Sequence, residues 1–363
     1  MPHLDFSHEE VERASRYHRP LYAALVVSFG LSVAVYSLLA WTWIGDRLWG
    51  AVAGLGWAAA AAAWAGLVLA VADLVGLPLA YWRGFLRERR WGFSTQTAGG
   101  WVVDRGKGLA VTILLGAAAW TGVVVGLARA LPGWWPVPAA AALALAVLFI
   151  SFVAPVVLEP LFHRFRPLED EHLAGELRAL ARRAGVPVRD VLVADASRRT
   201  TKVNAYVSGL GSTRRVVLFD TLLEAAGEPE VKLVVAHELG HRRDGHVAKL
   251  TLVAMSAAAV GVVLLWAILG TRVASPRELP VVLLLAAVFE LVLVAPSAWL
   301  SRRFERAADR ASLELTNDLP AFERAHVELA RKNLSDLVPP RLAYLLLFTH
   351  PTPPERLALA RAH

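Results

Sequence analysis

The sequence contains no cysteine among its 363 residues. A chain without cysteine has no disulfide framework, no thiolate metal ligand and no cysteine nucleophile, so any metal site must use histidine and carboxylate. Charged residues are also sparse, at 19%, whereas hydrophobic residues make up 56% and the mean hydropathy is +0.46. This composition is too apolar for an ordinary soluble domain and indicates a polytopic membrane protein with an additional soluble part.

The net charge is +7, and most of the basic residues are arginines beside apolar runs. Charge in that position usually reports membrane topology, so we expect no nucleic-acid partner. Nothing in the sequence indicates an oligomeric state.

Six apolar segments are long enough to cross a bilayer. They run from Leu21 to Ile44, Trp49 to Tyr81, Gly108 to Leu131, Val137 to Leu161, Leu250 to Leu269 and Leu279 to Leu300. The first is too long for a signal-peptide core and lacks a convincing cleavage site, so it reads as a retained span. The arginine-rich segments (the start, 82–107, 162–247 and everything after 300) then fall on one side. By the positive-inside rule we expect a multi-pass protein of the plasma (inner) membrane with both termini in the cytoplasm.

The central motif is His237-Glu238-Leu239-Gly240-His241, an H-E-x-x-H sequence in a helix-patterned run. On a helix the two histidines are i and i+4, so both imidazoles project from one face and can bind a single zinc ion. A carboxylate at Glu238 is placed to take a proton from the attacking water and pass it to a leaving amine, as in metalloproteases. The motif lies in a cytoplasmic segment under the topology above.

Residues 162 to about 247 have the composition of a soluble α/β unit. Leu173, Leu177, Leu180 and Ala184 recur at helical spacing, and residues 190–195, 202–207 and 214–219 read as short strands. We therefore predict a mostly α-helical membrane protein with about six transmembrane helices and a cytoplasmic α+β zinc protease domain. Residues 1–161 would form an N-terminal membrane domain with four spans. Residues 162–363 would form a metallopeptidase domain with two further spans (250–269 and 279–300) and a C-terminal catalytic segment.

A catalytic zinc site needs a third protein ligand. Downstream candidates are Glu305 and His350, and Glu305 has the better context because Asp309 follows it one helical turn later. One acid could bind the metal while the other orients a ligand histidine. Alternatively, Glu305 could pair with Arg302 or Arg306 in a solvated charged face.

Five motifs in order resemble the type I CAAX prenyl endopeptidase family of integral-membrane gluzincins and its bacterial HtpX-like relatives. They are His237 to His241 with His246, Ser301 to Asp309, His350-Pro351 with Arg356, Asn204-Ala205-Tyr206 with Val217 to Asp220, and Trp91-Gly92-Phe93 through Gln96-Thr97. The resemblance covers most of the chain. Eukaryotic members have seven spans around a large chamber, whereas we count six here.

The resemblance implies one zinc ion held by His237, His241 and Glu305, with Glu238 as the base. Asp309 would orient a ligand histidine, and His350 would stabilise the oxyanion. The substrate backbone would bind at Asn204, Ala205 and Tyr206, with Arg356 supporting the site. The substrates implied are membrane-associated or CAAX-like polypeptides.

Two rival classes stay open at this point. A site-2-type intramembrane protease would bury its motif within spans and draw an aspartate ligand from a later span. A transporter or a scaffold with structural zinc would show repeats and several midplane polar residues. Asp73 and Glu290 are the only acids well inside spans, and Asp73 fits either an intramembrane functional role or solvation at the interface. For His246, five residues after His241, we expect a structural or supporting role.

Overall fold

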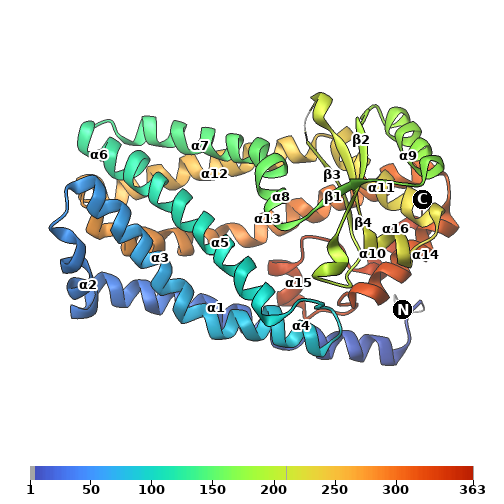
Figure 1. The fold of residues 1–363 in the computed structure, drawn as a ribbon, viewed down its shortest axis with the longest axis horizontal. Coiled ribbons are helices and arrows are strands. Elements are labelled where there is room, and N and C mark those ends of the chain that lie inside the picture. Colours follow the sequence, from blue (N-terminus) through green and yellow to red (C-terminus); the bar gives the residue numbers. More distant parts are fainter. Residues whose placement is uncertain (1–4, 210, 363) are drawn as a thin grey trace.

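The computed structural model describes residues 5–209 and 211–362. Long helices fill one end of the molecule, and a small sheet with shorter helices fills the other (Figure 1). Six helices are long and apolar enough to cross a membrane. The prediction of a mostly helical chain with six candidate spans is thus confirmed.

Helix α1 (His8–Trp41) begins thirteen residues before the predicted span. Ser7 caps it in a reciprocal pair with Glu10. Pro20 lies inside the helix and removes the N–H that would bond the Arg16 carbonyl. Arg87 from the neighbouring α4 donates to that carbonyl at 3.0 Å, so the helix continues past the proline.

The expected second span, Trp49 to Tyr81, is interrupted. Helix α2 (Trp43–Ala53) ends before the glycines at 54 and 56, and α3 (Trp57–Tyr81) begins after them. Glycine loses more conformational entropy than other residues when it enters a helix, and this low helix propensity explains the break inside an apolar run. Helix α3 continues through a π-helical turn (Trp82–Leu86) into α4 (Arg87–Arg90).

The remaining membrane helices follow the predicted order. They are α5 (Ala98–Ala118), which extends through a π-helical segment (Ala119–Gly126) into α6 (Leu127–Ala130), then α7 (Pro136–Val153), α12 (His246–Leu269) and α13 (Leu279–Thr316). A third π-helical stretch (Ala154–Leu158) leads from α7 into α8 (Glu159–Phe162). Span six and the arginine-rich stretch after it form one helix, α13, because no helix-breaking residue separates them beyond Pro296.

The sheet has four strands in the order β1-β2-β4-β3. They are β1 (Phe165–Pro167), β2 (Asp190–Ala194), β4 (Arg215–Phe219) and β3 (Ala205–Ser208); β2 and β4 run parallel and the other pairs antiparallel. Strand β1 was not predicted, because three residues containing a proline carry no readable alternation. Strand β3 begins three residues later than predicted and forms one edge of the sheet.

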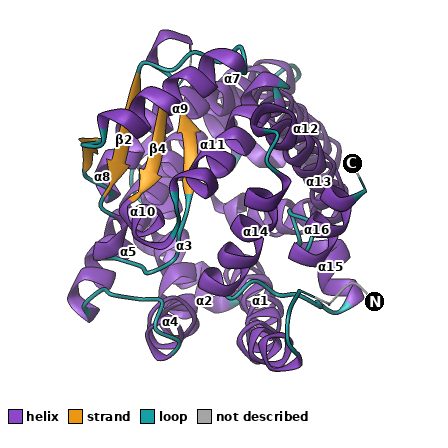
Figure 2. Ribbon diagram, turned by 90° about the vertical axis from the view of Figure 1, so that its right-hand side faces the viewer, coloured by secondary structure: helices purple, strands orange, loops and turns teal. Residues whose placement is uncertain are grey.

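The sheet packs against α9 (Glu171–Arg183) and α11 (Glu228–Arg243), with α10 (Asp220–Ala225) between strand and helix. The C-terminal helices α14 (Leu319–Asn333), α15 (Arg341–Leu347) and α16 (Pro353–Arg361) lie on the other side of α11 from the strands (Figure 2). Apolar residues of α1, α14 and α16 share one core. The first membrane helix therefore packs against the C-terminal helices.

Candidate functional site

Helix α11 presents two histidines, His237 and His241, toward α13. The helix starts with Pro229 in its first turn and acidic residues at 228 and 230, which suit the positive end of the helix dipole. A Cβ atom added at Gly240 would lie 2.8 Å from the Cβ of Ala311 and 3.3 Å from the backbone of Ala308. The missing side chain at Gly240 lets the two helices approach closely.

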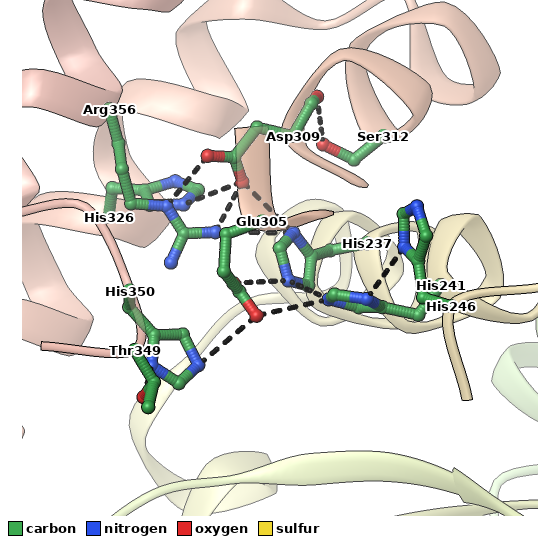
Figure 3. A network of polar contacts seen from close by, with 10 residues as sticks. All are labelled: His237, His241, His246, Glu305, Asp309, Ser312, His326, Thr349, His350 and Arg356. Carbon is green, nitrogen blue, oxygen red and sulfur yellow. Dashed lines mark hydrogen bonds and ion pairs between the residues drawn. The ribbon is translucent and has the colours of Figure 1, made fainter. Parts of the chain in front are cut away.

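This close approach gathers three ligand-type side chains (Figure 3). His237 Nε2 lies 3.2 Å from Glu305 Oε2, and His241 Nε2 lies 3.3 Å from Glu305 Oε1. The two Nε2 atoms are 3.1 Å apart. One ligand atom from each residue lies within 4.8 Å of the others, the spacing expected around a single metal ion.

Glu305 shows the need for a cation most directly. Its Oε2 atom is buried and accepts no hydrogen bond from any described residue. A buried carboxylate oxygen without a partner is costly unless a cation lies beside it. Arg302 does not supply that charge, because it donates to the carbonyls of Tyr344, at 3.0 Å, and Phe348. Two imidazoles and a carboxylate therefore fit a divalent metal, with room for a further ligand.

Asp309 supports the cluster from behind. Its Oδ1 lies 2.9 Å from His237 Nδ1, which leaves the Nε2 atom of that ring free for a metal. Arg356 Nε donates to Asp309 Oδ2 at 2.9 Å, and its second nitrogen contacts Oδ1. Asp309 is fully buried. His326 lies 3.8 Å from Oδ1, and burial together with Arg356 lowers the pKa of His326 to about 3.

His246 takes the corresponding place behind His241. The two Nδ1 atoms are 3.1 Å apart, so one donates to the other. The His246 ring stacks on Phe304, with centroids 4.3 Å apart and planes 12° from parallel. His246 thus lies beside the candidate metal site and is not one of its three ligand-type residues.

A cavity of 570 Å³ opens beside the cluster, and Glu238, His350 and Asn204 line it. Burial raises the pKa of the Glu238 carboxyl, and the neighbouring histidines oppose that rise. His350 Nε2 lies 3.3 Å from Glu305 Oε1, and its Nδ1 lies 2.9 Å from the Thr349 hydroxyl. A base candidate and a donor candidate thus face the same space as His237 of the candidate metal site.

Comparison with known proteins agrees with this arrangement. Residues 167–363 match Peptidase family M48, and residues 4–164 match the N-terminal region of CAAX prenyl proteases, described as five membrane helices. The chain belongs to peptidase family M48. It is a multi-pass membrane metalloprotease of that family.

Individual relatives of this M48 member span both bacteria and eukaryotes. An uncharacterized metalloprotease of Bacillus subtilis, YhfN, is 29% identical over 79% of this chain and 70% of its own length. CAAX prenyl protease 1 of Saccharomyces cerevisiae is 32% identical over 52% of this chain and 41% of its own length. The crystal structure of S. mikatae Ste24p superposes with a TM-score of 0.83 at 22% identity, covering 98% of this chain and 90% of that one. This last likeness shows that the fold is shared.

The residues that sequence reasoning assigned to substrate and support occupy different places in the M48 fold. Asn204 lines the cavity, whereas Ala205 is buried in the sheet core and the Tyr206 hydroxyl donates to Glu159 at 3.2 Å. Arg356 also lines the cavity, but its guanidinium is engaged by Asp309. Their assignment to substrate remains a prediction.

Several cavity residues were not singled out from the sequence. They are His18 and Tyr22 of α1, His326 and Asn333 of α14, and Asp336. Asn333 accepts from the Val203 N–H at 3.0 Å and donates to the Val203 carbonyl at 3.1 Å, so it holds the chain just before Asn204. No motif or spacing marks these residues, because they come from segments that meet only in the folded chain.

Within the described residues, neither acid inside a span belongs to the candidate metal site. Asp73 forms an ion pair with Arg105 of α5. Glu290 is exposed on α13. The H-E-x-x-H helix is not among the six candidate spans, and the third ligand-type residue is a glutamate. Both features differ from the intramembrane site-2 arrangement.

Proposed function

We propose that this chain is a zinc endopeptidase that hydrolyses peptide bonds of membrane-associated polypeptides, with CAAX-like substrates as one class. The observation that carries the proposal is the convergence of His237, His241 and Glu305 beside a cavity that Glu238 also lines. The names of the yeast and bacterial relatives support the protease reading.

A zinc ion held by these three residues would supply a Lewis acid for the peptide carbonyl and would make water easier to deprotonate. Glu238 accepts the proton of the attacking water as the new C–O bond forms. It then delivers that proton to the amine nitrogen as the C–N bond breaks. Its buried, raised-pKa carboxyl suits both transfers.

In this mechanism His350 donates a hydrogen bond to the developing oxyanion. When the Thr349 hydroxyl donates to His350 Nδ1, the ring proton resides on Nε2, which faces Glu305 and the cluster. A donor aimed at the position where negative charge develops stabilises the transition state more than the ground state. Asp309 and His246 orient the two ligand histidines through their Nδ1 atoms.

The substrate backbone would bind along the outer edge of β3. The Asn204 carbonyl accepts a hydrogen bond from the Phe219 N–H of β4. Alternate residues of an antiparallel strand face the partner strand, so the main-chain groups of Ala205 and Val207 point away from the sheet. Arg242 of α11 donates a hydrogen bond to the Val207 carbonyl, and the Ala205 N–H donates to the side-chain oxygen of Asn204. The Ala205 carbonyl and the Val207 N–H have no partner among the described residues and can bond an extended peptide beside α11.

We also propose the location and division of the chain. The arginine-rich segments support a cytoplasmic active site and cytoplasmic termini in the plasma (inner) membrane. A membrane unit would comprise residues 1–161, and a metallopeptidase unit would comprise residues 162–363.

The deciding experiment compares the detergent-purified parent with Glu238→Gln. Metal content is measured on both, with cleavage of casein and of a prenylated peptide. We expect about one zinc per chain in each protein and a loss of at least about 100-fold in cleavage by the variant. Glu169→Gln, which neutralises an exposed acid outside the cavity, serves as the matched control. Absence of zinc from both proteins, or cleavage that survives in Glu238→Gln, would overturn the proposal.

A further inference from the structure

The cavity beside the metal cluster extends well beyond the catalytic groups. Its far wall comes from α1, through His18, Leu21 and Tyr22, and from the segment after α14, through Ser335 and Asp336. The first membrane helix and the C-terminal half of the chain therefore share one wall of the same space. None of these residues has a part in the hydrolysis described above.

Asp336 is the unusual group in this wall. It is only 4% exposed. The Tyr22 hydroxyl donates to its Oδ2 at 2.5 Å, and the Val338 N–H donates to its Oδ1 at 3.2 Å. Across residues 5–209 and 211–362, no lysine, arginine or histidine nitrogen is recorded within 4.0 Å of its carboxylate.

The contrast with the other buried acids of the site is clear. Asp309 is paired with Arg356, and Glu305 belongs with His237 and His241 to the candidate metal site. Asp336 instead has two neutral donors and a position on a cavity wall. A carboxylate taken out of water without a counter-charge is costly, so this wall favours a cation from outside the chain.

Two further aromatic rings lie next to Tyr22, the residue whose hydroxyl contacts Asp336. The Tyr22 ring stacks on His18, with centroids 6.2 Å apart and planes at 28°, and it lies 6.4 Å from the Phe348 ring. Ring faces attract ammonium and guanidinium groups, and a carboxylate adds a charge-assisted hydrogen bond. Both kinds of group point to an organic cation. A metal ion is a poorer match, because it would need more oxygen ligands than one carboxylate.

We propose that Asp336, Tyr22 and Phe348 form a subsite for a lysine or arginine side chain of the bound polypeptide. This proposal rests on the proposed function, because it treats the cavity as the place where polypeptide binds. A basic side chain is also what a membrane-associated substrate presents on the cytoplasmic face, where lysine and arginine gather beside spans. The chain itself carries a net charge of +7, so attraction at this wall is a local property.

The test uses peptide pairs that differ at one position, lysine against the uncharged norleucine, with that position moved along both sides of the scissile bond. Dissociation constants are measured on the Glu238→Gln protein and on Glu238→Gln combined with Asp336→Asn. The kcat/KM ratio for each pair is measured on the parent and on Asp336→Asn. Glu169→Gln again serves as the control, because it removes an acid outside the cavity.

We expect lysine to be preferred by about tenfold at one position in both binding and kcat/KM, since a hydrogen bond to a charged group is worth that much. In Asp336→Asn the ratio should fall close to one, and in Glu169→Gln it should be unchanged. Phe348→Leu keeps the carboxylate and removes one ring, so it should lower the ratio by about two- to threefold, even if Asp336→Asn does not fold.

No preference at any position, or a preference that survives Asp336→Asn, would overturn the subsite. Failure of the protease reading has a different signature. The parent would then cleave no peptide, while the binding measurements would still report for or against a cation site.

Discussion

Asp309 Oδ1 lies 2.9 Å from His237 Nδ1 while Arg356 Nε donates to Asp309 Oδ2 at 2.9 Å. One buried carboxylate thus joins a histidine of the candidate metal site on α11 to an arginine of α16. The ring orientation of His237 depends on this bridge, because the Nδ1 contact directs Nε2 toward Glu305.

Asp309→Asn should therefore weaken metal binding. The amide keeps the shape of the side chain but removes the charge that makes the imidazole a strong ligand, so we expect a 10- to 100-fold loss of zinc affinity. Competition with a zinc chelator of known affinity would measure it. Ser312→Ala, which removes a hydroxyl that donates to the Asp309 carbonyl, should change the affinity little by comparison. Equal affinity in the parent and Asp309→Asn would refute the role of the bridge.

His350→Gln should lower kcat with little change in KM. The residue is expected to act on charge that exists only in the transition state, so its removal should cost about 10²- to 10³-fold in kcat. Steady-state cleavage and zinc content are measured together. A variant that lost zinc instead would show that His350 acts through the metal cluster and not on the oxyanion.

Gly240→Ala should destabilise the protein and separate α11 from α13. The added methyl would lie 2.8 Å from Ala311 Cβ, and overpacking of this kind typically costs about 1–3 kcal/mol. The unfolding temperature measured in detergent and the affinity for zinc should both fall.

Gly175→Ala provides the matched comparison for that substitution. Gly175 is exposed in the middle of α9, and a Cβ there meets nothing within 4 Å. Helix propensity alone should stabilise that variant by up to about 1 kcal/mol. If both substitutions shifted the unfolding temperature in the same direction, the close helix contact would not be what Gly240 serves.

Stability should fall on acidification in a way that His326 explains in part. Its pKa is about 3 in the folded protein, below the usual value of about 6.5, because burial and Arg356 oppose the charged form. Between about pH 6.5 and 3 the unfolded chain binds a proton that the folded chain does not. His326 therefore lowers the free energy of unfolding by up to about 1.4 kcal/mol for each unit that the pH falls within this window. Above about pH 7.5 its contribution no longer changes with pH.

His326→Gln isolates this contribution. The difference in unfolding temperature between variant and parent, measured at pH 8 and at pH 5, should move in favour of the variant at pH 5. A difference that is the same at both values would show that His326 does not carry the effect.

Much of the fold could be predicted because its signals are local. An apolar run of about twenty residues identifies a span wherever it packs, and the i, i+4 spacing of His237 and His241 puts both rings on one face of any helix. The predicted six spans agree with the structure for this reason. The prediction failed where the signal was short, at the break near Gly54 and Gly56 and at the three-residue strand β1.

The sequence by itself determined the membrane class of the chain, the order of its spans and the candidate metal-binding helix. Only the tertiary structure decided that Glu305 faces the two histidines and not Arg302, that Arg356 meets Asp309, and that Asp336 lies beside Tyr22 of α1 on the cavity wall. These relationships join residues from 47 to more than 300 positions apart, such as Arg356 with Asp309 and Asp336 with Tyr22. Periodicity constrains neighbours one or two turns apart, whereas distances between remote side chains depend on how the helices pack.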